Sequence, residues 1–180
     1  MRTIFTITAA ALLAGCAQDA AQENEANTLI ASPETRTGGT EPDIPLAVPV
    51  DAETAKRLMA ERHENYEKIG DAMKLVTREL KSDSPDLSNV RKGAGTIATL
   101  APLVPSWFPA GTGPDVGKTE AKAVIWERPE DFQSKAQAFE QAAAAFRAAA
   151  QGSDLEAIRA AHADLGKACK ACHDLYREKD

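Results

Sequence analysis

Two cysteines three positions apart, with a histidine directly after the second, lie near the C-terminus in the run Cys169-Lys170-Ala171-Cys172-His173. This spacing is the signature of c-type haem attachment. Positions i and i+3 of a helix lie on one face, so both thiols can reach the two vinyl groups of one porphyrin. His173 can then direct its imidazole at the iron from one side of the ring. The sequence therefore predicts one covalently bound haem c per chain, held by Cys169 and Cys172, with His173 as an iron ligand.

A structural zinc site and a redox dithiol are the alternative interpretations of this run. Structural zinc sites normally take four nitrogen or sulfur ligands, and beyond the motif the chain offers only His63, His162 and Cys16. A thioredoxin-like dithiol requires a βαβ context, and the hydrophobic pattern of this chain indicates none. Haem attachment is therefore the favoured interpretation.

The N-terminal segment resembles a bacterial lipoprotein signal. An uninterrupted run of apolar residues and threonines extends from Ile4 to Ala14. It is shorter than the roughly 20 residues of a membrane span, but it suits a signal-peptide core. The run ends in Leu13-Ala14-Gly15-Cys16, a pattern in which the cysteine is lipidated and becomes the mature N-terminus; the alternative is an ordinary cleavable signal with an incidental cysteine. We expect a signal peptide over residues 1–15, export to the periplasm, and lipidation of Cys16, with anchoring at the outer rather than the inner membrane.

Residues 16–49 have the composition of a flexible tether, rich in polar residues and proline and poor in large apolar residues. Such a segment cannot bury enough surface to offset its chain entropy. The formal net charge of −6 argues against nucleic-acid binding, which needs clustered lysine and arginine. No other apolar stretch is long enough to span a membrane, so the expected membrane contact is through the lipid alone.

Residues 50–180 show helical periodicity and no strand signal. Asp51 is a good N-cap for a first helix. Its stripe repeats at steps of three and four residues and is apolar except for one arginine: Leu58, Arg62, Tyr66, Ile69, Met73, Val76 and Leu80. Ser84 and Pro85 are expected as the N-cap and first residue of a second helix, which Pro102 ends.

Two further helices are expected in the C-terminal third of the chain. Pro129 favours the first turn of the third helix, and Gly152 can end that helix in the left-handed region. The segment Ser153–Glu156 forms a capping box for the fourth helix, whose stripe includes Cys169 and Cys172. The haem motif therefore lies within an amphipathic helix.

These patterns together predict an all-α, antiparallel four-helix bundle with its haem near the C-terminus. Bundles build cofactor sites from side chains on facing helices, and a chain of this length supports one core. The long connection before the third helix carries Trp107 and Trp126 near its ends, and we expect both rings to hold it against the core.

The residues resemble the cytochrome c′ family over almost the whole of residues 51–179. The resemblance rests on the C-terminal run Gly166–Arg177, on two aromatic segments in the long connection, Pro105–Phe108 and Glu120–Trp126, and on the first-helix residues Arg62, Tyr66 and Gly70.

This resemblance implies a bundle that is often a homodimer, with a five-coordinate haem and His173 as the only protein ligand. It further implies that Tyr66 crowds the opposite face of the iron, that Arg62 lies by the haem propionates, and that Arg177 lies near His173. The resemblance also implies that the protein binds nitric oxide and carbon monoxide and largely excludes oxygen.

Three functions compete. The first is a gas-binding haem protein that acts as a nitric oxide sink, carrier or sensor. The second is a periplasmic electron-transfer cytochrome with a redox partner protein and a sixth ligand, for which Met59, Met73 and His63 are the candidates. The third is a haem enzyme such as a peroxidase, which needs a distal acid–base group; because only His63 offers one, we expect no enzyme.

Helix geometry separates these candidate ligands. It favours a surface position for His63 and core packing for Met73, whereas Met59 lies one turn before Arg62 and is harder to dismiss. His162 shares a helix face with His173 but lies about 16 Å from it along the helix. We therefore expect His162 to be a packing or interface residue.

Overall fold

The computed structural model of the protein describes residues 50–179. The predicted signal peptide, the lipidation site Cys16 and the tether therefore lie outside the described residues. The described elements are α1 (Ala52–Leu80), α2 (Leu87–Leu100), the 3-10 helix η1 (Ala101–Trp107), α3 (Val124–Glu127), α4 (Pro129–Ala150) and α5 (Leu155–Tyr176). The predicted all-α bundle is confirmed, and none of the described helices is long and apolar enough to cross a membrane.

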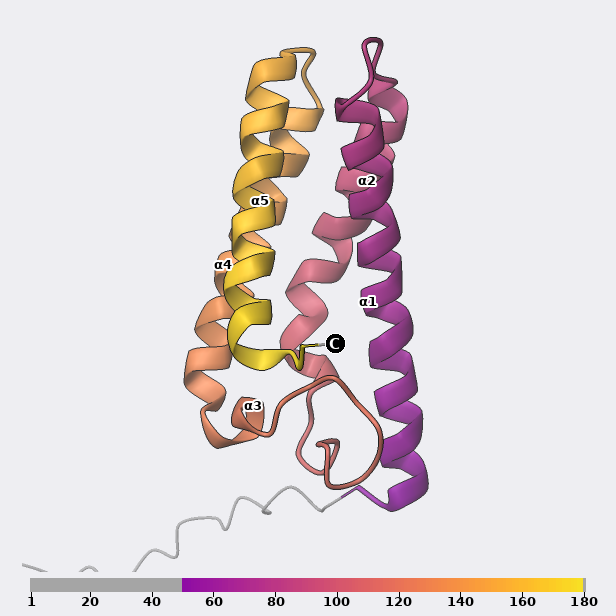
Figure 1. Cartoon of the computed structure of the whole chain (residues 1–180), viewed down its shortest axis with the longest axis vertical. Coiled ribbons are helices and arrows are strands. Elements are labelled where there is room, and N and C mark those ends of the chain that lie inside the picture. The colour runs from indigo at the N-terminus through magenta and orange to yellow at the C-terminus, as the bar shows by residue number, and fades with distance from the viewer. Residues whose placement is uncertain (1–49, 180) are drawn as a thin grey trace, which may run out of the picture. The chain divides into compact units, whose positions relative to one another are not determined.

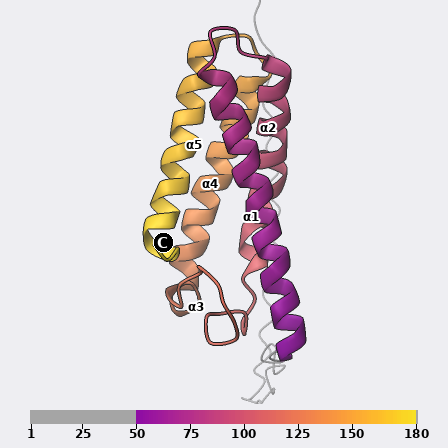
Figure 2. The same cartoon turned by 45° about the vertical axis from the view of Figure 1, so that its right-hand side comes forward.

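The four long helices α1, α2, α4 and α5 run side by side in alternating directions (Figures 1 and 2). α1 packs on α2, α4 packs on α5, and α2 packs on α4. The backbones of α1 and α5 approach each other much less closely. Between them, His162 of α5 contacts Thr77 of α1, and Arg159 of α5 donates to the carbonyl oxygen of Leu80. The segment between η1 and α4, which contains the short α3, lies across one end of the bundle (Figure 1).

Three of the four long helices have an aspartate as N-cap, although the sequence pattern predicts an aspartate for only one of them. Asp51 caps α1 as predicted, with its carboxylate accepting from the backbone N–H groups of Glu53 and Thr54. The expected caps Ser84 and Ser153 are wrong, because Asp86 caps α2 and Asp154 caps α5. An ionised carboxylate accepts more strongly than a hydroxyl and also interacts favourably with the helix dipole.

The helix ends also differ in detail from expectation. α2 ends before Pro102 as predicted, but the chain continues through Pro102 and Pro105 as η1. Gly152 does not adopt the left-handed conformation, since Gly111 is the only glycine with positive φ among the described residues. Instead the N–H groups of Gln151 and Gly152 donate to carbonyl groups three residues earlier, which satisfies the end of α4 without a left-handed residue.

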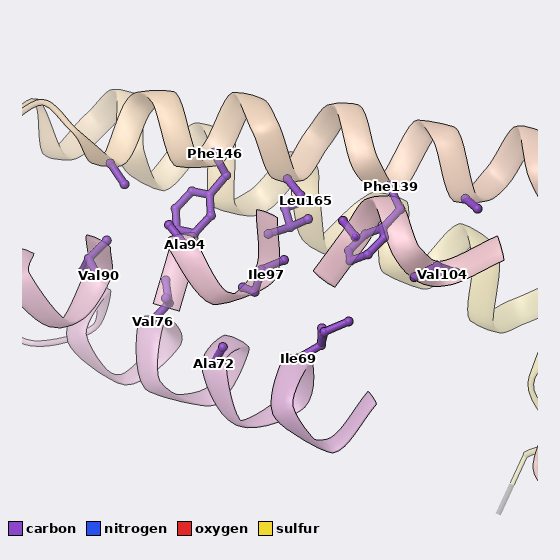
Figure 3. Packing of buried hydrophobic residues seen from close by; sticks show 14 of the residues in the cluster. Ile69, Ala72, Val76, Val90, Ala94, Ile97, Val104, Phe139, Phe146 and Leu165 are labelled. Carbon is purple, nitrogen blue, oxygen red and sulfur yellow. The ribbon is translucent and has the colours of Figure 1, made fainter. Parts of the chain in front are cut away.

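One hydrophobic core runs through the bundle. Phe132, Phe139 and Phe146 recur every seven residues on α4 and are all buried. Figure 3 shows Phe139 and Phe146 on the side of α4 that faces α2, with Ile97 below them and Leu165 of α5 alongside. Burial of each ring contributes about 2 kcal/mol to stability, and α4 packs against both α2 and α5.

α1 and α2 approach most closely at Gly93. A Cβ atom added there would lie 2.5 Å from Val76 Cγ2 and 3.1 Å from the carbonyl oxygen of Ala72. Gly95, two positions further along α2, has nothing within 4 Å of the same added atom. Packing therefore requires a glycine at position 93 but not at position 95.

We predict that Gly93→Ala lowers the free energy of unfolding by about 1–3 kcal/mol, because the added methyl group overpacks the α1–α2 contact. Gly95→Ala should raise it by up to about 1 kcal/mol, because alanine has the higher helix propensity. Urea unfolding of the two variants measures both changes. Equal effects of the two substitutions would contradict the close approach at Gly93.

Candidate haem site

The two cysteines of the motif lie on α5 as free, half-buried thiols packed against the core. Burial raises the pKa of both thiols, and the neighbouring Cys169 adds to the effect that raises the pKa of Cys172 to about 11. A raised thiol pKa is the opposite of the lowered pKa that makes the cysteines of a redox dithiol reactive. The described residues contain no group of three or more histidines, cysteines, aspartates or glutamates that could hold a metal ion. The arrangement does not support the zinc and dithiol interpretations.

Arg62 is buried in α1, with 4% of its surface exposed. Its Nη1 donates to the carbonyl oxygen of Trp107 and to Thr112 Oγ1, both at 3.3 Å. Its Nη2 donates to the carbonyl oxygen of Thr112 and to Thr119 Oγ1, both at 3.1 Å. The guanidinium carbon lies 4.6 Å from the ring centre of Phe108. Arg62 therefore holds the connection between η1 and α4 onto α1.

No carboxylate in the described part of the chain pairs with this buried charge. Burial lowers the pKa of Arg62, yet a guanidinium stays charged in proteins. Four of its five N–H groups are engaged as above, and Nε makes no hydrogen bond to any described residue. A buried cation with one remaining donor fits a haem, whose propionate groups carry the missing negative charge.

Tyr66 lies one helical turn after Arg62 on α1. Its ring meets Trp107 edge to face at 5.3 Å and Phe108 at 6.2 Å between ring centres. Burial raises its pKa well above the usual range, with the Cys172 thiol adding to the rise and the charge of Arg62 opposing it. Cys169, Cys172 and Arg62 are therefore close enough to Tyr66 to affect its pKa. Tyr66 and the two cysteines also pack against the same hydrophobic core.

Phe108 is the centre of an aromatic cluster that extends from α1 to α5. Its ring contacts Phe132 at 4.8 Å and Trp126 at 5.9 Å between centres, and Phe132 in turn meets Tyr176 at 5.2 Å. The indole Nε1 of Trp126 donates to the carbonyl oxygens of Phe108 and Pro109. The expectation that the tryptophans hold the long connection against the core is thus confirmed.

Arg177 lies at the C-terminal end of α5, four residues after His173. Its Nε donates to Glu120 Oε2 at 2.7 Å, and its backbone N–H donates to the carbonyl oxygen of His173 at 3.1 Å. Burial is the main cause of a lowered His173 pKa, and the charge of Arg177 is the second. Arg177 therefore lies near His173, and its role beside a haem stays a prediction.

Glu120 was not among the sequence-predicted site residues. Residue 121 forms an isolated antiparallel bridge with Arg177, and the N–H groups of Lys122 and Glu178 donate to the carbonyl oxygens of Tyr176 and Glu120. These bonds tie the end of α5 to the connection before α3. A pairing between single residues so far apart in the chain leaves no local pattern in the sequence.

The three alternative iron ligands are either exposed or packed against other parts of the protein. His63 is exposed, with its Nε2 3.5 Å from Glu67 on the same helix, as predicted. Met59 is buried, and its Sδ and Cε lie within 4 Å of a Cβ added at Gly117, so it packs on the connection. Met73 packs against the core, which confirms the expectation for it.

His162 is also a packing residue. It lies 3.3 Å from Thr77 Oγ1 through Nε2, and its ring centre lies 5.5 Å from that of Phe146. Burial lowers its pKa. The contact joins α5 to α1 well away from the haem motif.

A family model described as "Cytochrome C'" matches residues 57–177. Cytochrome c-554 of Cereibacter sphaeroides is 36% identical over 139 residues, which cover 74% of this chain and 89% of that protein.

Two solved structures of cytochromes c′ are similar in fold. One, described by its "unusual ligand-controlled dimer dissociation", has a TM-score of 0.65 and 28% identity, and the match covers 69% of this chain and 97% of that one. A nitric oxide complex of a cytochrome c prime mutant from Alcaligenes xylosoxidans has a TM-score of 0.62 and 30% identity, covering 73% of this chain and 98% of that one.

We predict that Arg62→Met lowers the free energy of unfolding by about 2–4 kcal/mol, because it leaves the buried carbonyl oxygens of Trp107 and Thr112 without a donor. Arg57→Met on the same helix is the control. It removes an exposed pair with Glu61 and should change stability by less than about 1 kcal/mol. Urea unfolding compares the two, and equal effects would mean that Arg62 does not hold the connection.

Proposed function

Since the chain belongs to the cytochrome c′ family, we propose that it is a c-type haem protein that binds nitric oxide and carbon monoxide at a five-coordinate iron. It serves as a sink, carrier or sensor of nitric oxide. The haem is held by thioether bonds to Cys169 and Cys172, and His173 is its only protein ligand. The family consists of non-enzymatic haem proteins that are typically periplasmic, in agreement with the expectation that the chain is not an enzyme.

One observation carries this proposal. The α1 side chain whose pKa is raised by burial and by the two thiols is Tyr66, a bulky phenol packed against Trp107. Among the described residues, the candidate ligand His63 is exposed, and Met59 and Met73 pack elsewhere. When bound, the haem iron supplies the coordination position that a gas molecule occupies. Tyr66 covers that position and restricts which molecules enter it.

The charged residues hold the group in place. Arg62 would hold a haem propionate through its remaining Nε–H group, and the propionate would supply the negative charge that balances the buried guanidinium. Arg177 is fixed by its 2.7 Å bond to Glu120 and lies on the His173 side. The two arginines therefore bring positive charge to the site from α1 and from the end of α5.

The expected homodimer belongs to the same proposal. A solved relative undergoes ligand-controlled dimer dissociation. In this chain a gas molecule has to move the Tyr66 ring, which is packed against Trp107 of η1. Movement of a close-packed ring disturbs the helix that carries it, and linkage requires that any effect of gas on dimerisation be matched by an effect of dimerisation on gas affinity.

We predict that the resting ferric protein has a high-spin or mixed-spin absorption spectrum. Tyr66→Ala should bind carbon monoxide faster and more tightly, while losing about 3 kcal/mol of stability as the packed ring is removed. Met73→Ala removes bulk from the same helix away from the thiols and should leave the binding rate unchanged. Stopped-flow mixing with carbon monoxide and with nitric oxide measures these rates.

Two results would contradict the proposal. Unchanged carbon monoxide on-rates in Tyr66→Ala would mean that this ring does not cover the iron. A low-spin ferric spectrum with a methionine-to-iron charge-transfer band would move the protein to the electron-transfer class.

We further propose that Cys16 is lipidated and that residues 16–49 tether the haem domain to the outer membrane. The support is the run Leu13-Ala14-Gly15-Cys16 after an apolar segment. Wild-type protein should fractionate with membranes, whereas Cys16→Ser should be released without detergent. Mass spectrometry of the mature N-terminus is the direct measurement, and an unmodified Cys16 would reject the anchor.

A further inference from the structure

The two tyrosines of the chain differ in what their hydroxyl groups bind. The hydroxyl of Tyr176 donates to Asp131 Oδ2. The hydroxyl of Tyr66 makes no hydrogen bond to any residue in the described part of the chain, although its ring is held by Trp107 and Phe108. This hydroxyl is therefore available for a partner that the chain itself does not supply.

The position of the hydroxyl indicates what that partner is. The thiols of Cys172 and Cys169 and the guanidinium of Arg62 are the groups that act on it electrostatically. Tyr66 of α1 and the two cysteines of α5 also pack against the same hydrophobic core, and in the proposed function the Tyr66 ring covers the iron. A ligand bound on the iron opposite His173 would enter this same space.

A small molecule can reach this hydroxyl. Every fully buried side-chain oxygen or nitrogen in residues 50–179 has a hydrogen-bond partner. Because the Tyr66 hydroxyl has none, it must be accessible to a molecule of the size of water, and a diatomic gas is of similar size. A phenol has an ordinary pKa of about 10, so the group is protonated near pH 7 and can act as a donor.

We propose that the Tyr66 hydroxyl donates a hydrogen bond to the outer atom of a gas molecule bound on the iron. This inference rests on the proposed function and deepens it, because it makes Tyr66 a specificity-determining residue through its chemistry as well as its bulk. Hydrogen-bond donors beside the open face of a haem help to decide which ligands it retains. Between the two gases of the proposed function, the hydrogen bond stabilises bound nitric oxide more than bound carbon monoxide, whose outer atom is the weaker acceptor.

The test compares Tyr66→Phe, which removes only the hydroxyl, with the wild-type protein. A hydrogen bond to the outer oxygen of carbon monoxide weakens the C–O bond, so infrared spectra of the ferrous carbon monoxide complex should show a higher C–O stretching frequency in Tyr66→Phe. The wild-type frequency should shift in deuterated water, and that of Tyr66→Phe should not. Dissociation of nitric oxide should be about five-fold faster in Tyr66→Phe, as expected for the loss of one ordinary hydrogen bond.

Tyr176→Phe is the matched control, because it removes the hydroxyl that binds Asp131 and should leave the C–O frequency unchanged. Identical frequencies in wild type and Tyr66→Phe, with no effect of deuterated water, would overturn the hydrogen bond while leaving gas binding intact. Failure of the wild-type protein to form any carbon monoxide complex would contradict the proposed function, and this inference with it.

Discussion

The buried charge of Arg62 is the constraint on which the haem-binding end of the bundle depends. An isolated charge in a protein interior is unfavourable by several kcal/mol unless it is paired or hydrogen-bonded. Here four N–H groups are satisfied by the connection between η1 and α4, and the ring of Phe108 lies over the guanidinium. These hydrogen bonds hold the connection against α1. The negative charge that would complete it comes from no described residue, and the haem propionates can supply it.

The aromatic cluster extends this constraint across the molecule. Tyr66 contacts Phe108, Phe108 contacts Phe132, and Phe132 contacts Tyr176 at the end of α5. Because Arg62 also lies over Phe108, the charge and the rings share one support. The pairing of residue 121 with Arg177 then ties the end of α5 back to the same connection. A continuous series of contacts thus connects Tyr66 on α1 with Arg177 at the end of α5.

Much of this arrangement could be predicted because its signals are local. The seven-residue spacing of Phe132, Phe139 and Phe146 and the position of the cysteines on one helix face follow from helical periodicity. The caps Asp86 and Asp154 were missed because a serine that fits the N-cap pattern lies just before each of them. Glu120 was missed for a different reason, since its bond to Arg177 joins segments 57 residues apart. Neither this pairing nor the four bonds of Arg62 has a sequence pattern, because both arise only when the helices are assembled.

The central claim is that the haem lies between α1 and α5, with Arg62 at its propionates and Tyr66 over the iron face opposite His173. X-ray diffraction from crystals of the haem-loaded ferric protein tests it most directly. We expect thioether bonds to Cys169 and Cys172, a propionate oxygen within hydrogen-bond distance of Arg62 Nε, and no protein atom on the iron except His173 Nε2. A methionine sulfur or a second imidazole on the iron, or propionates that project into solvent away from Arg62, would contradict the account.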